Sequence, residues 1–133
     1  CLFEAHFFIL RNFYGGINMK VAVVGSRCLY INSLKPYIPA DVTEIVSGGA
    51  RGVDTAAKYF AKNSNLIYTE FLPEYDKYGR LAPLIRNDRI IARADMVVAI
   101  WDGKSRGTKY VIDKCREIGK TVKVYIVSSE TMD

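Results

Sequence analysis

The stretch VAVVGSR, residues 21–27, decides the fold of this chain. Its continuous apolar run ends in Gly25, which is the pattern of a strand buried on both faces of a parallel sheet. Segments of similar character recur along the chain, so we expect five strands in all. The other four are expected at Glu44–Val46, Leu66–Phe71, Met96–Trp101 and Val122–Val127.

Helical patterns separate these strands. Apolar residues recur at helical spacing over Gly52–Lys62, Pro83–Ala94 and Thr108–Ile118, and Gly119 is placed to end the last helix. The first connection, Leu29–Ile38, is a short amphipathic stretch broken by prolines, and Pro73–Arg80 is predicted to be a loop. This alternation predicts an α/β fold: a single Rossmann-like three-layer domain with a mainly parallel sheet of about five strands.

Composition excludes several classes of protein. The 133 residues suffice for one domain, and the net charge of +5 with a pI of 9.1 favours anionic partners without specifying them. Cys1, Cys28 and Cys115 form no CxxC pair, and His6 is the only histidine, so we expect reduced cysteines and no metal site. We also expect no cofactor, no membrane span and a cytoplasmic location.

Residues 1–18 differ in character from the rest of the chain. They are rich in phenylalanine and directly precede Met19, which opens the first strand. A signal peptide is excluded because no basic n-region or small-residue cleavage site is present. We expect residues 1–18 to be a non-native or upstream-translated extension and residues 19–133 to form the domain. The alternative is a genuine extension whose aromatic residues pack on a neighbour.

The loops after the strands predict an anion site. In an open parallel sheet, ligands bind outside the carboxyl ends of the strands, where helix N-termini and glycine-rich turns offer N–H donors. Two glycine-rich turns here lead into helices, and serine, threonine and arginine side chains accompany them. We therefore expect phosphate binding by Gly25, Ser26, Arg27, Ser47, Gly48, Gly49, Arg51, Ser105, Arg106, Gly107 and Thr108.

The helix predicted at Pro83–Ala94 carries a second signal. Asn87 interrupts an apolar stripe formed by Leu84 and Ile91, and a buried amide needs a partner. A backbone group of a neighbouring loop and a ligand are equal candidates for that partner. Arg86, and less so Arg93, are candidates for a ligand; the alternative is a solvated basic helix face.

Aromatic residues near the strand ends are candidates to stack on a base. For Trp101 we favour core packing. For Tyr75 and Tyr78, in the polar loop, stacking or lid formation is an even alternative to an exposed position.

Four motifs in order resemble one superfamily. GSR at 25–27, SGGARGVDTAA at 47–57, RNDRIIARADMVVAIWDG at 86–103 and SRGT at 105–108 are similar to the SLOG superfamily of Rossmann-like domains. That group includes the DNA-processing protein DprA, the LOG phosphoribohydrolases and small bacterial YspA-like proteins. The resemblance covers nearly all of residues 19–126 and is closest to the DprA-like and YspA-like members. It implies a ligand site that includes Arg86 and Asn87 besides the loop residues.

The sequence departs from the LOG enzymes at one decisive position. Their PGGxGTxxE motif places a catalytic glutamate three residues after the threonine, where this chain has Val111. Lys104-Ser105-Arg106 also stands in place of Pro-Gly-Gly. These differences put a LOG-type N-glycosidic hydrolysis in doubt.

Three functions are consistent with these patterns. The leading hypothesis is a nucleotide or nucleotide-derivative binding protein, a sensor or carrier. The second is a nucleotide hydrolase, with Asp54, Glu74, Asp76 and Asp102 as candidate acids, of which Asp54 suits a helix start and Asp102 a turn. The third is DprA-like binding of single-stranded nucleic acid. Homo-oligomerisation is a further expectation from the resemblance.

Overall fold

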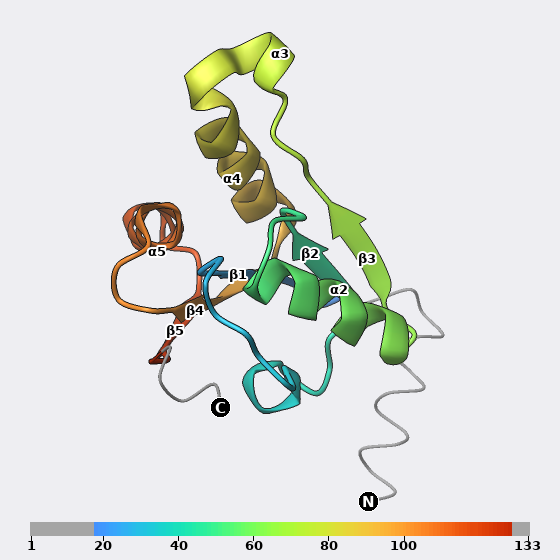
Figure 1. Cartoon of the computed structure of the whole chain (residues 1–133). Helices are drawn as coiled ribbons and strands as arrows, with labels where there is room; N and C mark the ends of the chain where they lie inside the picture. Colours follow the sequence, from blue (N-terminus) through green and yellow to red (C-terminus); the bar gives the residue numbers. More distant parts are fainter. Residues whose placement is uncertain (1–17, 129–133) are drawn as a thin grey trace, which may run out of the picture.

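A five-stranded parallel sheet forms the centre of the molecule in the computed structural model, which describes residues 18–128 (Figure 1). The strands run in the order β3-β2-β1-β4-β5. Their bounds are β1 Lys20–Gly25, β2 Glu44–Ser47, β3 Ile67–Glu70, β4 Met96–Trp101 and β5 Val122–Ile126. The expected extension lies outside the described residues except for its last residue, so it stays a prediction, and residues 129–133 also lie outside.

The connections are mostly helical. The crossovers carry η1 Lys35–Tyr37, α2 Val53–Asn63, α4 Ala82–Arg93 and α5 Arg106–Ile118. The predicted α/β class, with one three-layer domain and a parallel sheet of five strands, is confirmed. No helix among residues 18–128 is long and apolar enough to cross a membrane.

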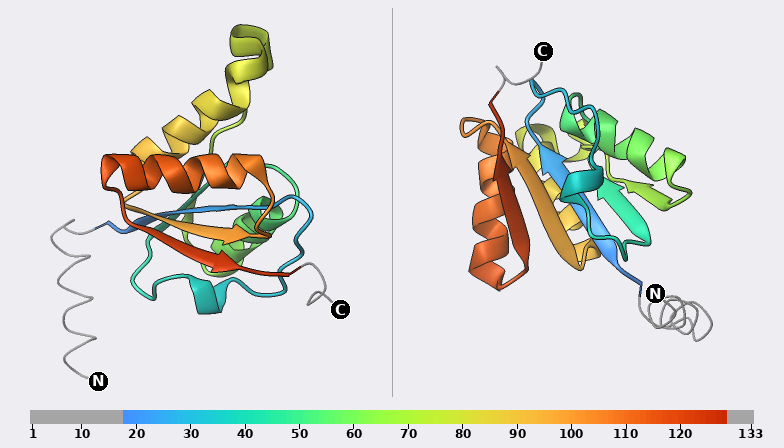
Figure 2. Two further views of the ribbon diagram at one scale, coloured as in Figure 1. Left: turned by 90° about the vertical axis from the view of Figure 1, so that its left-hand side faces the viewer. Right: turned by 90° about the horizontal axis from the view of Figure 1, so that it is seen from below.

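Strand β1 is the middle strand of the sheet, and both of its faces are buried. Val21 and Val23 pack on the face covered by α2 and the first crossover. Ala22 and Val24 pack on the opposite face against α4 and α5. This alternation is the two-residue period of a strand, and Figure 2 shows η1 and α5 on opposite sides of the sheet.

The first crossover forms only a single 3₁₀ turn. Pro36 lies within that turn, and a proline disfavours the α conformation for the residue before it. Leu29, Leu34 and Ile38 nevertheless anchor the segment in the core, where each is at most 9% exposed. The amphipathic pattern therefore specifies burial here without specifying a helix.

Two predictions about the connections were wrong. The predicted loop Pro73–Arg80 contains a short helix, α3 at Tyr75–Tyr78, followed by η2 at Gly79–Leu81. These turns and the start of α4 project away from the sheet (Figure 1). Helix α5 begins at Arg106, two residues before the predicted start. Its predicted end is confirmed, because Gly119 adopts a left-handed conformation with a φ of 77° and closes the helix.

Candidate functional site

A cavity of about 350 Å³ lies where the strand order reverses. Strand β1 connects to β2 on one side and pairs with β4 on the other, so the carboxyl ends of β1 and β4 form the topological switch point. Ligands bind at such points in open α/β sheets. The lining includes eight of the predicted site residues: Gly25, Ser26, Arg27, Arg86, Asn87, Ser105, Gly107 and Thr108.

A second cavity, of about 230 Å³, adjoins the first. Both are lined by Arg27, Ala50 and Arg86, so these residues form the boundary between the two spaces. The predicted residues Gly48, Gly49 and Arg51 line this second cavity. We call the two spaces together the switch-point site.

Arg86 is the charged group at the centre of the switch-point site. Arg86 is buried, with 8% of its surface exposed. Its Nε donates to Asn87 Oδ1 at 2.9 Å and its Nη1 donates to the Gly48 carbonyl at 2.7 Å. Among residues 18–128, no carboxylate oxygen lies within 4.0 Å of the guanidinium. Burial lowers the pKa of Arg86, and the negative charge of Asp54 opposes this shift.

Asn87 is satisfied in a way that the sequence did not predict. Its oxygen accepts a hydrogen bond from the neighbouring Arg86 side chain, not from a backbone group of another loop. The backbone alternative was therefore wrong for this oxygen, whereas contact of Asn87 with a ligand stays a prediction. The amide nitrogen of Asn87 donates to no described residue, and the side chain lines the cavity.

Ser26 and Asp102 hold the ends of β1 and β4 together. The buried Ser26 hydroxyl accepts the Asp102 N–H at 3.1 Å, and the Ser26 amide donates to the Ile100 carbonyl at 3.2 Å. Asp102 Oδ1 accepts the N–H groups of Lys104 and Ser105 at 2.8 Å each. The hydrogen bond from the Ser105 N–H is the largest contribution that holds the pKa of Asp102 well below its usual range. Asp102 is therefore a turn residue, as its position in the sequence predicted.

The N-terminus of α5 contributes neutral donors to the same cavity. Ser105 Oγ and Thr108 Oγ1 lie 3.2 Å apart and both side chains line the space. The N–H groups of the first turn, Arg106 to Thr108, have no acceptor among the described residues, as is usual at a helix start. The positive end of the helix dipole adds to the potential there.

The glycines of the loops mainly make room for the protein itself. A Cβ atom at Gly25 would lie 2.5 Å from Val53 Cγ2 and from the Ile100 carbonyl oxygen. At Gly48 it would lie 2.6 Å from Arg86 Nη1. At Gly107 it would meet no heavy atom within 4 Å, so this glycine alone among the three leaves open space.

Asp54 is a cavity residue that the phosphate prediction did not include. It lies in the first turn of α2, is 7% exposed, and accepts the Ala50 N–H at 3.0 Å through Oδ2. Burial raises its pKa, while the hydrogen bond from Ala50 and the charge of Arg86 act in the opposite direction. The sequence signal was present, since an acid directly after a glycine-rich turn marks both a helix start and a ligand loop.

Two predicted site residues lie outside the switch-point site. Ser47 is fully buried at the end of β2 and lines neither cavity, because the strand continues one residue further than predicted. Arg106 is exposed and lines neither cavity. It is the first residue of α5, so the early start of the helix turns it away. A ligand role for the residues that do line the site stays a prediction.

The basic face of α4 is largely paired within the protein. Arg89 donates to Glu74 at 3.0 Å, and its guanidinium lies 5.6 Å from the centre of the Tyr78 ring. Arg93 donates to both carboxylate oxygens of Glu44 at 2.9 Å. The expected exposed position is confirmed for Arg93, whose side chain is 44% exposed. The sequence did not predict its pairing with the buried carboxylate of Glu44 at the start of β2.

The other aromatic candidates take separate positions. Trp101 is half-buried, packs on the core and donates its Nε1–H to the Ser105 carbonyl at 2.9 Å, which confirms the packing interpretation. Tyr75 is 56% exposed.

Within residues 18–128, no group of three histidine, cysteine, aspartate or glutamate side chains is placed to hold a metal ion.

Comparisons with known proteins establish the fold. No family model matches the chain, and no curated protein matches it. The X-ray structure of DNA processing protein A (DprA) from Streptococcus pneumoniae matches with a TM-score of 0.65 at 23% sequence identity. The domain is similar in fold to DNA processing protein A. The match covers 84% of this chain and 51% of the other, so this chain spans about half the length of that protein.

Proposed function

We propose that the domain is a binding protein for a nucleotide or nucleotide derivative, a sensor or carrier that holds the phosphate in the switch-point site. The proposal rests on the unused hydrogen-bond donors of the buried Arg86 guanidinium. A buried guanidinium has five N–H donors, and within residues 18–128 only two of them are used, both on neutral oxygens of Gly48 and Asn87. The remaining donors belong to a side chain that lines both cavities.

An anion would satisfy what the protein leaves open. Burial disfavours the charged form of Arg86, and a phosphate beside it would offset that cost with charge-assisted hydrogen bonds. Arg27 is exposed and lines the same two cavities, so it can approach the ligand from the solvent side. The cavity of about 350 Å³ is near the lower end of ligand sites, which span roughly 300–1,000 Å³.

Titration calorimetry of the full chain with AMP, NAD and inorganic phosphate tests the proposal. We expect Arg27→Gln and Arg86→Leu each to weaken binding by about tenfold or more, equivalent to roughly 1.4 kcal/mol. Arg116→Gln is the matched control, because Arg116 is an exposed arginine in the last turn of α5, at the far end of that helix. Because Arg86→Leu removes a buried side chain, the exposed Arg27 variant keeps the test valid if the other fails to fold. Equal affinity in all three variants would refute the site.

Single-stranded nucleic acid is a second candidate ligand. It is favoured by the shared fold with a protein whose name states DNA processing. Against it, Arg89 is paired with Glu74 and Arg93 with Glu44, so two cations of α4 are already neutralised within the protein. A short oligothymidine should then bind more weakly than AMP. Tighter oligothymidine binding with a steep loss on adding salt would favour the nucleic-acid function.

Hydrolysis of a nucleotide rests on Asp54. It is the candidate acid that combines a place in the cavity with a pKa raised by burial, a combination found at catalytic acids. Its hydrogen bond with the Ala50 N–H equally fits a purely structural role. Incubation with nucleoside monophosphates decides between them: release of free base that is lost in Asp54→Asn supports catalysis, and no release above buffer excludes it for these substrates.

A further inference from the structure

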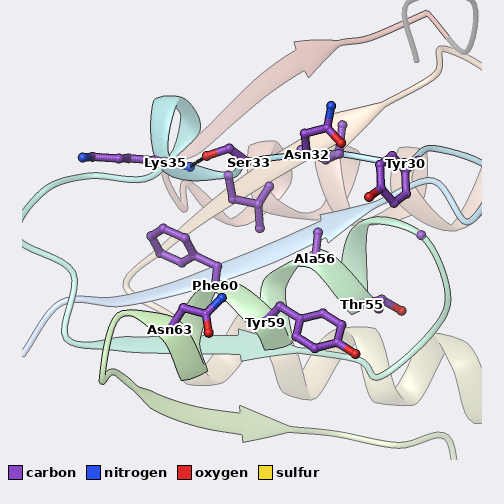
Figure 3. Close-up of a pocket in the computed structure, with 12 residues that line it drawn as sticks. Tyr30, Asn32, Ser33, Lys35, Thr55, Ala56, Tyr59, Phe60 and Asn63 are labelled. Carbon is purple, nitrogen blue, oxygen red and sulfur yellow. Dashed lines mark hydrogen bonds between the residues drawn. The ribbon is translucent and has the colours of Figure 1, made fainter. Parts of the chain in front are cut away.

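A third cavity, of about 580 Å³, lies between the first crossover and α2 (Figure 3). It shares no lining residue with the two cavities of the switch-point site. Its twelve lining residues are Tyr30, Ile31, Asn32, Ser33, Leu34, Lys35, Gly52, Thr55, Ala56, Tyr59, Phe60 and Asn63. We call it the crossover cavity.

The crossover cavity exists because the first connection is not a full helix. A helix between β1 and β2 would pack beside α2 and fill this space. Instead, Leu29 and Leu34 anchor an irregular segment in the core, and the residues between them form one wall. The opposite wall is a stripe of α2 at spacing i, i+4 and i+8, formed by Thr55, Tyr59 and Asn63.

The chemistry of the walls is aromatic and nearly uncharged. Tyr30, Tyr59 and Phe60 supply three rings, and Tyr59 is 61% exposed although it is a large apolar side chain. The lining contains no carboxylate, and its one charged side chain is Lys35, which Figure 3 shows at the opposite end of the segment from Tyr30. The side-chain amides of Asn32 and Asn63 make no hydrogen bond to another described residue.

We propose that the crossover cavity is a second small-molecule site, for a planar aromatic heterocycle that carries no positive charge. Rings around the cavity favour a planar aromatic ligand by stacking and edge contacts, each worth about 0.5–1.5 kcal/mol beyond burial. Amide and hydroxyl groups at the rim match the donors and acceptors of a heterocycle. The absence of acidic side chains from the lining leaves a cationic ligand without a counter-charge.

The proposal is independent of the function assigned to the switch-point site, because none of its residues contributes there. The two regions adjoin at Gly52 and at Thr55, whose hydroxyl donates to the Ala50 carbonyl at 3.3 Å. A Cβ atom at Gly52 would lie 2.5 Å from the Arg27 carbonyl oxygen, and the φ of Gly52 is 71°. Ligand binding in the crossover cavity can therefore be tested with the switch-point site empty or mutated.

The test uses three probes with one ring and different charge. Indole-3-carboxamide is neutral, indole-3-acetate is anionic and tryptamine is cationic at neutral pH. Each is titrated into the full ¹⁵N-labelled chain, and the amide chemical shifts report both affinity and location. We expect the neutral and anionic probes to bind with a Kd below about 1 mM, with shifts on α2 and the crossover, and tryptamine to bind about tenfold more weakly.

Matched tyrosine variants locate the site. Tyr59→Ala should weaken binding at least about fivefold, equivalent to roughly 1 kcal/mol. Tyr75→Ala should not change it, because Tyr75 is a comparably exposed tyrosine outside the cavity. Ala56→Leu, which fills the cavity from α2, should abolish binding. The proposal is overturned if neither neutral nor anionic probe binds, if tryptamine binds as tightly, if the shifts fall on the switch-point residues, or if the two tyrosine variants behave alike.

Discussion

The contact between Gly48 and Arg86 is the most direct place to test the structure. Gly48 is buried at the end of β2, and its carbonyl accepts the Arg86 Nη1 hydrogen bond at 2.7 Å. An alanine Cβ at this position would lie 2.6 Å from Nη1 and 3.0 Å from Cζ. The φ of Gly48 is not in the left-handed region, so Gly48→Ala adds a clash without adding backbone strain.

The expected cost depends on the atoms that must move. Small-to-large changes in packed sites cost about 1–3 kcal/mol, and a hydrogen bond from a charged donor contributes about 1.5–3 kcal/mol. The two effects overlap, because moving the guanidinium relieves the clash and breaks the bond. We therefore expect Gly48→Ala to destabilise the domain by about 2 kcal/mol, which for a domain of this size lowers the Tm by about 8 °C. Nucleotide affinity should fall at least about tenfold.

Urea unfolding and calorimetry of the full chain measure the effect. Gly107→Ala is the control for urea unfolding, since a Cβ there meets no heavy atom within 4 Å and the residue lies in the first turn of α5. This control should be unchanged or more stable by up to about 1 kcal/mol. For calorimetry, Arg116→Gln is the control, because Gly107 lines the switch-point site. If Gly48→Ala stays within about 0.5 kcal/mol of the unmodified chain, the guanidinium is not held against Gly48 and the geometry of the site is wrong.

A double-mutant cycle separates this contact from other effects of the alanine. In an Arg86→Leu background the guanidinium is gone, so the cost of Gly48→Ala should fall by about 1 kcal/mol or more. A cost that is the same in both backgrounds would show that the alanine disturbs something other than Arg86.

Three further outcomes are expected elsewhere in the domain. The Cys28 thiol donates a hydrogen bond to Asp102 at 3.2 Å, and this bond raises the pKa of the thiol. We therefore expect slow alkylation of Cys28 at pH 8, measured by peptide mass mapping, and faster alkylation in Asp102→Asn. Burial raises the pKa of Glu44, but the hydrogen bonds that the carboxylate accepts outweigh burial and hold the pKa below 4.5. The carboxylate should therefore stabilise the fold at neutral pH and lose this contribution as the pH falls below 4.5. In urea unfolding, Glu44→Gln should lose less stability between neutral and acidic pH than the unmodified chain. Gly119→Ala should cost about 1 kcal/mol in urea unfolding because of its φ of 77°.

The sequence predicted the sheet better than the connections. A strand such as β1 is buried on both faces, so its apolar run is unambiguous and the alternation with helices indicates a parallel sheet. The first crossover shows the limit of such patterns. Leu29 and Leu34 are spaced for burial, and Pro36 prevents a regular helix, but nothing in the spacing indicates the cavity left beside α2.

Errors in the predicted site come from boundaries and from side-chain partners. The two-residue error at the start of α5 placed Arg106 in the loop, whereas it is the first helical residue and lies outside the cavities. The pairing of Arg93 with Glu44 joins residues 49 positions apart, and no local pattern encodes it. The interruption of the apolar stripe by Asn87 correctly indicated a buried polar side chain. The hydrogen-bond partner of its oxygen was not predictable, because it depends on the rotamer of Arg86.

The glycines and the arginine of the switch-point site report different properties. Gly25 and Gly48 are required by the close approach of Val53 and Arg86, so a glycine-rich turn after a strand here reflects packing of the protein on itself. In the proposed function, the preference for anions is assigned instead to Arg86, which is held by neutral oxygens and is not neutralised by a contacting carboxylate among the described residues. A domain with the same glycines but with leucine in place of Arg86 on α4 should lose the proposed preference for anions. For this domain we therefore expect the cation that α4 places against the β2 loop, and not the glycine pattern, to determine the charge of the ligand.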